Sequence, residues 1–131
     1  MNNSITIKLY DQQYQSQWNQ YVQNHPEGTV FHLSQWKKSI EKSFSHKDYS
    51  LIALAAENSL SSGQIVGILP LTEIKSFLFG HYLVSIPFAE LGGVLSDNPE
   101  IEQQLIERAG EIAREVRCDY LELKNRKLLQ N

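Results

Sequence analysis

Residues 64–124 decide the fold, and they read QIVGILPLTEIKSFLFGHYLVSIPFAELGGVLSDNPEIEQQLIERAGEIAREVRCDYLELK. Short apolar runs with strand periodicity come first, followed by a paired glycine, one long amphipathic helix and a last alternating segment. The strand-like segments 81–86 and 118–123 bracket the helix. We therefore expect them to be parallel neighbours in one sheet, joined by a right-handed crossover.

The helix between these two strands carries clear boundary signals. Asn98 suits the N-cap and Pro99 suits the first helical position, while Glu100 and Glu102 complement the positive end of the helix dipole. Apolar residues recur along one face at helical spacing: Ile101, Leu105, Ile106, Ala109, Ile112, Ala113 and Val116. We expect a helix over residues 99–117 that covers one flank of the sheet.

The rest of the chain predicts the remaining elements. They are a strand at 5–9, a helix from Asp11 that ends in the turn 25–28, an extended piece at 29–33, a helix from Ser34, and a hairpin of strands at 49–57 and 64–74. The whole order is β-α-α-β-β-β-α-β. This order predicts a mixed α/β (α+β) fold in a single domain that spans residues 1–131.

Composition limits the class of protein. With 131 residues, 41% of them hydrophobic and 21% charged, the chain is an ordinary globular sequence. The net charge of −3 and the scattered Lys and Arg residues argue against a duplex nucleic-acid surface. The uncharged stretches are too short to predict a membrane span. A lone Cys118 and an N-terminus without signal-peptide features predict a cytoplasmic location.

Metal and nucleophile motifs are weak in this sequence. The four histidines, His25, His32, His46 and His81, have no spacing that places two of them on one helical face. With a single cysteine they form no zinc motif, so we expect no metal site. Cys118 begins a predicted buried strand, where a cysteine is more often a packing residue than a nucleophile.

Four phrases, taken in order, carry a family resemblance. They are FHLSQW at 31–36, IVGILPL at 65–71, SFLFGHYLVSIPFAELGGVLSD at 76–97 and DYLELK at 119–124. Together they resemble the N-terminal half of FemAB-related proteins, aminoacyl- or acyltransferase-like enzymes built from two tandem halves with the N-acyltransferase (GNAT) fold. Some of these proteins are associated with bacterial exopolysaccharide and protein-sorting systems, and thus with the cell envelope. The resemblance implies a GNAT-like three-layer α/β/α sandwich with a mixed sheet, here an incomplete acyltransferase fold.

The same resemblance implies a function. The chain would position an amine or a glycan-linked or peptide-precursor acceptor, and a second half would deliver the acyl group or an aminoacyl-tRNA. Two alternatives remain open at this point. One is a stand-alone GNAT acetyltransferase that uses acetyl-coenzyme A, and the other is a non-catalytic half that forms a homodimer through its open sheet edge.

Six residues are candidates for substrate binding: Trp36, Lys37, Pro87, Gly92, Gly93 and Asp97. Proline would end strand pairing where two parallel strands separate, and paired glycines let the backbone approach a ligand closely. Each candidate also has a structural interpretation. Trp36 fits a core position, Lys37 a solvated helix face, Pro87 and the glycines a turn, and Asp97 a helix end. No catalytic residue is assigned.

Coenzyme A is not expected at the start of the 99–117 helix. A pyrophosphate would need free backbone amides there. Pro99 removes one amide, Asn98 would occupy another, and Asp97 and the two glutamates would repel the anion. We therefore predict no cofactor for this chain, in agreement with the acceptor-binding role that the resemblance implies.

Overall fold

The computed structural model describes residues 5–36, 38, 47–55, 63–76, 78, 80–85 and 93–123. Its elements are β1 (Thr6–Leu9), the 3-10 helix η1 (Gln12–Tyr14), α1 (Gln15–Asn24), the 3-10 helix η2 (Val30–His32), β2 (Lys47–Asp48), β3 (Leu51–Leu54), β4 (Ile65–Leu69), β5 (Thr72–Ser76), β6 (Gly80–Val84), β7 (Leu95–Ser96), α3 (Pro99–Glu115) and β8 (Tyr120–Glu122). Residues 34–36 and 38 are also helical. The predicted mixed α/β class is confirmed.

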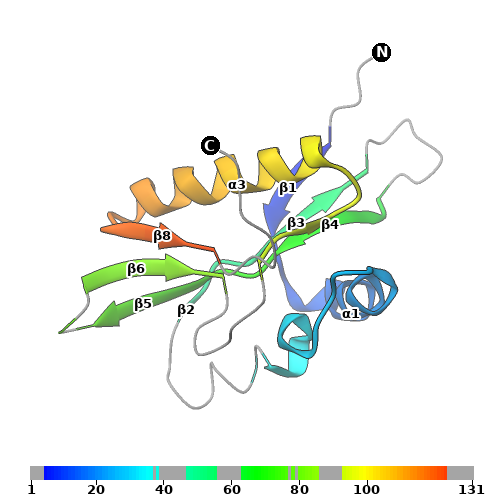
Figure 1. Cartoon of the computed structure of the whole chain (residues 1–131), viewed down its shortest axis with the longest axis horizontal. Coiled ribbons are helices and arrows are strands. Elements are labelled where there is room, and N and C mark those ends of the chain that lie inside the picture. The colour runs from blue at the N-terminus through cyan, green and yellow to red at the C-terminus, as the bar shows by residue number, and fades with distance from the viewer. Residues whose placement is uncertain are drawn as a thin grey trace.

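The described strands form two four-stranded sheets (Figure 1). Sheet A has the order β1-β3-β4-β7, and all of its pairs are antiparallel. Sheet B has the order β2-β5-β6-β8 and is mixed, because β6 and β8 run parallel. Tyr82 lies opposite Tyr120 and Val84 lies opposite Glu122, so the parallel neighbours that the sequence predicts are confirmed.

The sequence predicts one sheet, and the structure divides it because two long strands break. Tyr49 and Ser50 separate β2 from β3, and Pro70 and Leu71 separate β4 from β5. Pro70 has no N–H group with which to continue the ladder. The Tyr49 N–H donates to the Leu71 carbonyl at 2.8 Å, and the Leu71 N–H donates to Ser50 Oγ at 3.0 Å. A side-chain hydroxyl thus replaces one backbone partner at the break.

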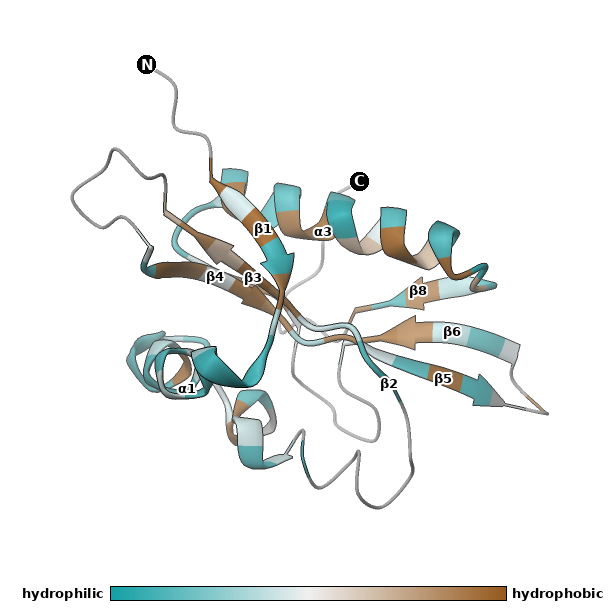
Figure 2. Ribbon diagram, turned by 180° about the vertical axis from the view of Figure 1, so that it is seen from behind, coloured by the Kyte–Doolittle hydropathy of each residue, from teal (hydrophilic) through white to brown (hydrophobic). Residues whose placement is uncertain are grey.

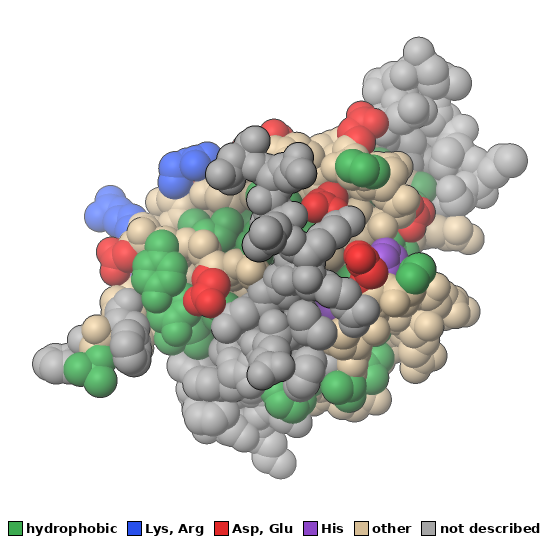
Figure 3. Space-filling view, in the orientation of Figure 1, with side chains coloured by type: hydrophobic (Ala, Val, Ile, Leu, Met, Phe, Trp, Pro, Cys, Tyr) green, Lys and Arg blue, Asp and Glu red, His purple; other side chains and the backbone are tan. Residues whose placement is uncertain are grey.

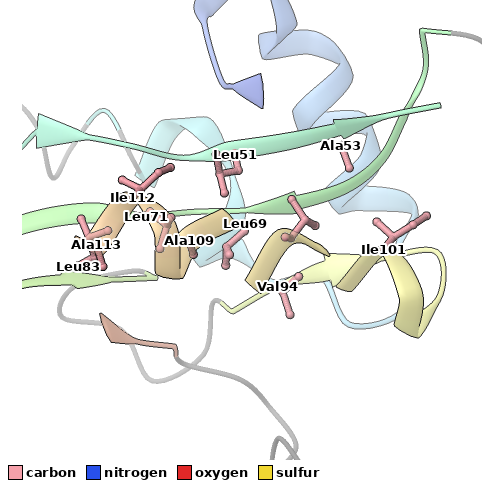
Figure 4. Packing of buried hydrophobic residues seen from close by; sticks show 11 residues of the cluster. Leu51, Ala53, Leu69, Leu71, Leu83, Val94, Ile101, Ala109, Ile112 and Ala113 are labelled. Carbon is pink, nitrogen blue, oxygen red and sulfur yellow. The ribbon is translucent and has the colours of Figure 1, made fainter. Parts of the chain in front are cut away.

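Helices cover sheet A on both faces, which gives the predicted three layers. The apolar stripe of α3 packs on one face, with Ile101 and Ala109 in one cluster with Leu51 and Leu69 (Figure 4). Trp18 and Val22 of α1 pack on the other face, together with three isoleucines and a leucine of the sheet: Ile52, Ile65, Ile68 and Leu95. Figure 2 shows the hydrophobic side of α3 turned toward the sheets and its polar side turned outward.

The boundaries of α3 follow the sequence signals. Asn98 Oδ1 accepts a hydrogen bond from the Ile101 N–H at 2.9 Å, and Pro99 is the first helical residue. Gly67 in β4 lets this helix approach the sheet closely. A Cβ atom at that position would lie 2.8 Å from Ile101 Cγ2 and 2.9 Å from Leu105 Cδ1.

The prediction for residues 29–33 is wrong, because Val30–His32 form a 3-10 turn instead of an extended segment. Two long-range contacts fix this turn. The His32 Nε2–H donates to the Gly93 carbonyl at 2.9 Å, and the Trp18 indole N–H donates to the His32 carbonyl at 2.6 Å. These partners lie far away in the sequence, so local periodicity could not indicate the turn.

The structure adds two short strands that the sequence did not predict, β2 and β7. Each has two residues, and each is defined only by its pairing with another strand. In the described part of the chain, no helix combines the length and the apolar character needed to span a membrane.

Candidate functional site

A groove of about 550 Å³ lies between the end of α1 and β7. Seven of the described residues line it: Tyr21, Asn24, His25, Pro26, Glu27, Ser96 and Asp97. A second groove of about 500 Å³ shares Tyr21 and Asn24 with it and continues along α1 toward Gln64. We call the first one the acidic groove, because its lining, as far as the structure describes it, contains two carboxylates and neither Lys nor Arg.

Tyr21 and Asp97 form the central contact of the acidic groove. The Tyr21 hydroxyl lies 2.8 Å from Asp97 Oδ1 and 3.0 Å from the Val66 carbonyl oxygen. The Val66 carbonyl also accepts a hydrogen bond from the Asp97 N–H at 3.0 Å, so β4 holds both groove residues in place. Burial raises the pKa of Tyr21, and the hydrogen bond to Asp97 and its negative charge raise it further. The phenol therefore stays protonated and acts as a donor.

Two hydrogen bonds fix the ring of His25 in the groove. Its Nε2 lies 2.9 Å from the Ser96 carbonyl oxygen, which can only accept, so this nitrogen carries the proton. Its Nδ1 accepts a hydrogen bond from the Glu27 N–H at 3.0 Å. Because both ring nitrogens are occupied, His25 joins α1 to β7 and is not available as a general base in this arrangement.

The turn after α1 depends on Gly28. The Gly28 N–H donates to the His25 carbonyl at 3.0 Å, which closes the turn that carries Glu27. A Cβ atom on Gly28 would lie 2.1 Å from the Val22 carbonyl oxygen, so only glycine fits against the last turn of α1. The sequence signal that ends the helix therefore also places one carboxylate of the groove.

Acidic side chains surround a histidine on one part of the described surface. Figure 3 shows Asp and Glu side chains beside a His side chain there, while the visible Lys and Arg side chains lie at the opposite end, next to other Asp and Glu side chains. Glu27 is half-buried and Asp97 is exposed. A negative groove of this kind favours a cationic ligand over an anionic one.

The start of α3 does not fit the pyrophosphate of coenzyme A. The Asp97 N–H donates to Val66, the Ile101 N–H donates to the Asn98 side chain, and Pro99 has no N–H. Glu100 adds another acidic side chain in the first helical turn. An anion at this helix start would meet carboxylates, with few free amides to bind it.

The pairing of the parallel strands β6 and β8 can be followed to Ser85. Within the described residues, the final hydrogen bond between them runs from the Ser85 N–H to the Glu122 carbonyl at 2.9 Å. The next described strand of the chain, β7, pairs with β4 in sheet A, while β8 remains in sheet B. Pro87, which the sequence predicts to end this pairing, lies outside the described residues, so that expectation stays a prediction.

The six candidate residues have different positions in the structure. Asp97 lines the acidic groove, and Gly93 is buried with its carbonyl bound to His32. Trp36 is half-buried and is not among the described residues that line either groove. Three candidates, Lys37, Pro87 and Gly92, lie outside the described residues.

Of the described lining residues, sequence reasoning predicted only Asp97. It missed the three others with titratable side chains, namely Tyr21, His25 and Glu27. Tyr21 falls on the apolar face of its helix, where it looks like a core residue. The other two belong to the turn that ends α1, and they look like helix-stop residues. Tyr21 and His25 find their partners in neighbouring residues of a distant segment, because Tyr21 binds Asp97 and His25 binds the Ser96 carbonyl of β7.

Solved structures share this fold. A GNAT-family acetyltransferase from Staphylococcus aureus subsp. aureus USA300_TCH1516 matches with a TM-score of 0.62 and 16% identity, over 98% of this chain and 93% of that one. A transcriptional regulator from Bacillus halodurans C-125 matches with a TM-score of 0.64 and 20% identity, over 95% and 83%. The aminoglycoside 6′-N-acetyltransferase AAC(6′)-Ih from Acinetobacter baumannii matches with a TM-score of 0.59 and 15% identity, over 98% and 82%.

These likenesses show that the chain has the fold of the GNAT acetyltransferases. No protein-family model matches the sequence, and no curated protein matches it.

Proposed function

We propose that this chain is an N-acyltransferase-like domain of the FemAB type that holds an amine acceptor in the acidic groove. The observation that carries the proposal is the pair of carboxylates, Glu27 and Asp97, in a groove whose described lining has neither Lys nor Arg. A protonated amine would exchange water for charge-assisted hydrogen bonds to these carboxylates. The Tyr21 hydroxyl, already bound to Asp97, would orient the carboxylate toward the amine.

The acyl donor comes from elsewhere in this proposal. The α3 start presents occupied amides and carboxylates, so the chain's own residues argue against a coenzyme A site there. A second half of the FemAB type would deliver an acyl or aminoacyl group to the amine. The bound ammonium must first lose a proton, which Asp97 or Glu27 can pass on to solvent. The neutral amine then attacks the acyl carbon, and the bond from that carbon to its carrier breaks.

The experiment measures amine binding. Spermidine, and an aminoglycoside such as kanamycin, are titrated into the chain by calorimetry at physiological salt. We expect binding that weakens about tenfold in Asp97→Asn, since a hydrogen bond to a charged group contributes about 1.5–3 kcal/mol. Glu111→Gln, on the exposed face of α3, is the matched control and should bind like the wild type. Equal loss in both variants, or no binding, would contradict the proposal.

A stand-alone acetyltransferase is the second candidate. The lengths of two acetyltransferase chains with the same fold favour it. This chain spans 93% of the first and 82% of the second. One structure of this fold, the aminoglycoside N-acetyltransferase AAC(6′)-Iy, is a complex with CoA. Thermal unfolding with millimolar acetyl-coenzyme A separates the two functions. The FemAB proposal predicts no shift, and a clear rise in the unfolding temperature would favour the acetyltransferase.

A further inference from the structure

Three side chains with metal-binding atoms converge where sheet B meets the end of α3. Glu73 of β5, His81 of β6 and Cys118, which follows α3, place a carboxylate oxygen, an imidazole nitrogen and a sulfur within 4.8 Å of one another. We propose that these three residues form a binding site for a borderline-soft divalent cation, with Zn²⁺ as the best fit. None of them lines the acidic groove, so this site is independent of the proposed acyltransferase function.

Strand pairing places the first two ligands. In the β5–β6 pair, Glu73 lies opposite Leu83 and Lys75 lies opposite His81. Because side chains alternate along a strand, all four point to the same face of sheet B. Glu73 Oε2 and His81 Nε2 lie 2.6 Å apart on this face. The His81 N–H donates to Asp119 Oδ2 at 2.9 Å, which fixes the backbone beneath the imidazole.

The end of α3 places the third ligand. Arg117 has a φ of 61°, and its N–H donates to the Arg114 carbonyl at 3.1 Å. The Cys118 N–H donates to the Ala113 carbonyl at 2.8 Å. These two hydrogen bonds form a Schellman motif, which ends the helix in a defined geometry. The cysteine backbone is therefore held at a set position above the strand pair.

The donor set fits Zn²⁺ chemically. Zinc binds sulfur at about 2.3 Å and nitrogen or oxygen at about 2.0–2.2 Å in a tetrahedron, so its ligand atoms lie about 3.3–3.8 Å apart. The 2.6 Å contact between Glu73 Oε2 and His81 Nε2 is a hydrogen bond, so a bound ion would replace its proton and separate the two atoms to about 3.3 Å. The carboxylate and the deprotonated thiol together offset the charge of a dication, and binding releases the thiol proton to solvent. Three protein ligands leave the fourth position open to water.

The burial of the cluster also suits a metal site. The side chains of His81 and Glu73 are 25% and 11% exposed, and Cys118 is half-buried. An ion can thus enter from solvent, while the partial exclusion of water strengthens its attraction to the ligands. The three ligands come from three separate segments, so a bound ion would tie α3 to sheet B.

The test uses Co²⁺ and Zn²⁺ on the untagged chain. Cys118 is the only cysteine, so a sulfur-to-cobalt charge-transfer band reports this residue alone. We expect one Co²⁺ per chain, displacement of the band by Zn²⁺, and a higher unfolding temperature with Zn²⁺. Cys118→Ala should abolish the band. His81→Gln and Glu73→Gln should each weaken binding at least about tenfold.

Two control variants make the test specific. Glu107→Gln and Glu111→Gln each remove an exposed glutamate of α3 that lies outside the cluster, so both should bind Co²⁺ like the wild type. Absence of a charge-transfer band in the wild type would overturn the proposal. It would also be overturned by a band that His81→Gln and Glu73→Gln leave unchanged, or by a stoichiometry of one ion per two chains.

Discussion

Helix α3 packs on both sheets, but the strand residues beneath it differ between sheet A and sheet B. Over sheet A, α3 presents Ile101 and Leu105 to Gly67, with the helix nearly against the strand backbone. Over sheet B, the strand face toward α3 carries the polar residues Glu73 and His81 together with Leu83. Close apolar packing supplies stability in the first region. In the second region, polar side chains take the place of part of that apolar packing, and these side chains can bind a ligand.

On the other face of sheet A, the packing of α1 supports the acidic groove. Trp18 is fully buried there, and its helix leads directly into the turn that lines the acidic groove. The groove residues are therefore attached to a helix that is anchored by a fully buried side chain. A binding site built on such a support keeps its geometry when the ligand is absent.

The largest effect should come from deleting packing under α3. Leu105 is fully buried over sheet A, so Leu105→Ala should lower the free energy of unfolding by about 3 kcal/mol. Leu121 of β8 is only half-buried, and Leu121→Ala should cost about 1 kcal/mol. Urea denaturation of both variants measures the difference. Equal losses would contradict the contrast between the two sheets.

Replacing each of two glycines by alanine should have opposite effects on the stability of the chain. Gly67→Ala places a methyl group 2.8 Å from Ile101 and should destabilise the chain by about 1–3 kcal/mol. Gly110, inside α3, would place its Cβ no closer than 3.8 Å to Arg114, so Gly110→Ala should stabilise by about 0.5–1 kcal/mol. Thermal unfolding compares them, and a stabilised Gly67→Ala would show that the helix is not closely packed on the strand.

The Tyr21 hydroxyl in the groove should affect how the stability of the chain depends on pH. Burial and Asp97 raise the pKa of Tyr21 above its ordinary value of 10.0, so the folded chain holds this proton more tightly than the unfolded chain. Stability from Tyr21 is therefore present below pH 10.0 and is lost as the pH rises above it. Tyr21→Phe should lower the free energy of unfolding by about 1 kcal/mol at neutral pH. At high pH, the free energy of unfolding of this variant should fall less steeply than that of the wild type. Identical slopes for the two proteins would argue against this assignment.

The smallest effect should arise at the end of α3. Arg117 has the left-handed conformation that a glycine adopts more easily, so Arg117→Gly should stabilise the chain by about 0.5 kcal/mol. Arg117→Ala keeps the backbone cost and removes the same charge, so it is the matched control. Chemical denaturation should rank glycine above alanine, and the opposite order would contradict the Schellman motif.

Local signals predicted the parts of the fold that local physics controls. The cap at Asn98, the proline at the start of α3 and the alternation of β8 are all encoded by neighbours in the sequence. The parallel pairing of β6 with β8 also followed, because a strand, a helix and another strand in this order favour that connection.

Contacts between distant residues account for what the sequence did not reveal. The turn at Val30–His32 depends on Gly93, and the break between the sheets depends on a hydrogen bond from Leu71 to Ser50. The proposed metal-binding cluster of Glu73, His81 and Cys118 joins three segments whose spacing matches no motif. In the candidate site, Asp97 was predicted, whereas Tyr21 and Glu27 were found only through the tertiary structure.

The central claim is that the acidic groove binds an amine, and a nuclear magnetic resonance titration with spermidine tests it most directly. We predict that backbone amide shifts concentrate at residues 24, 25, 27, 96 and 97, which line the groove. They should saturate at millimolar ligand or below, and weaken about tenfold in Asp97→Asn. Shifts centred instead on the exposed acidic face of α3, at Glu107, Glu111 and Glu115, would contradict the claim.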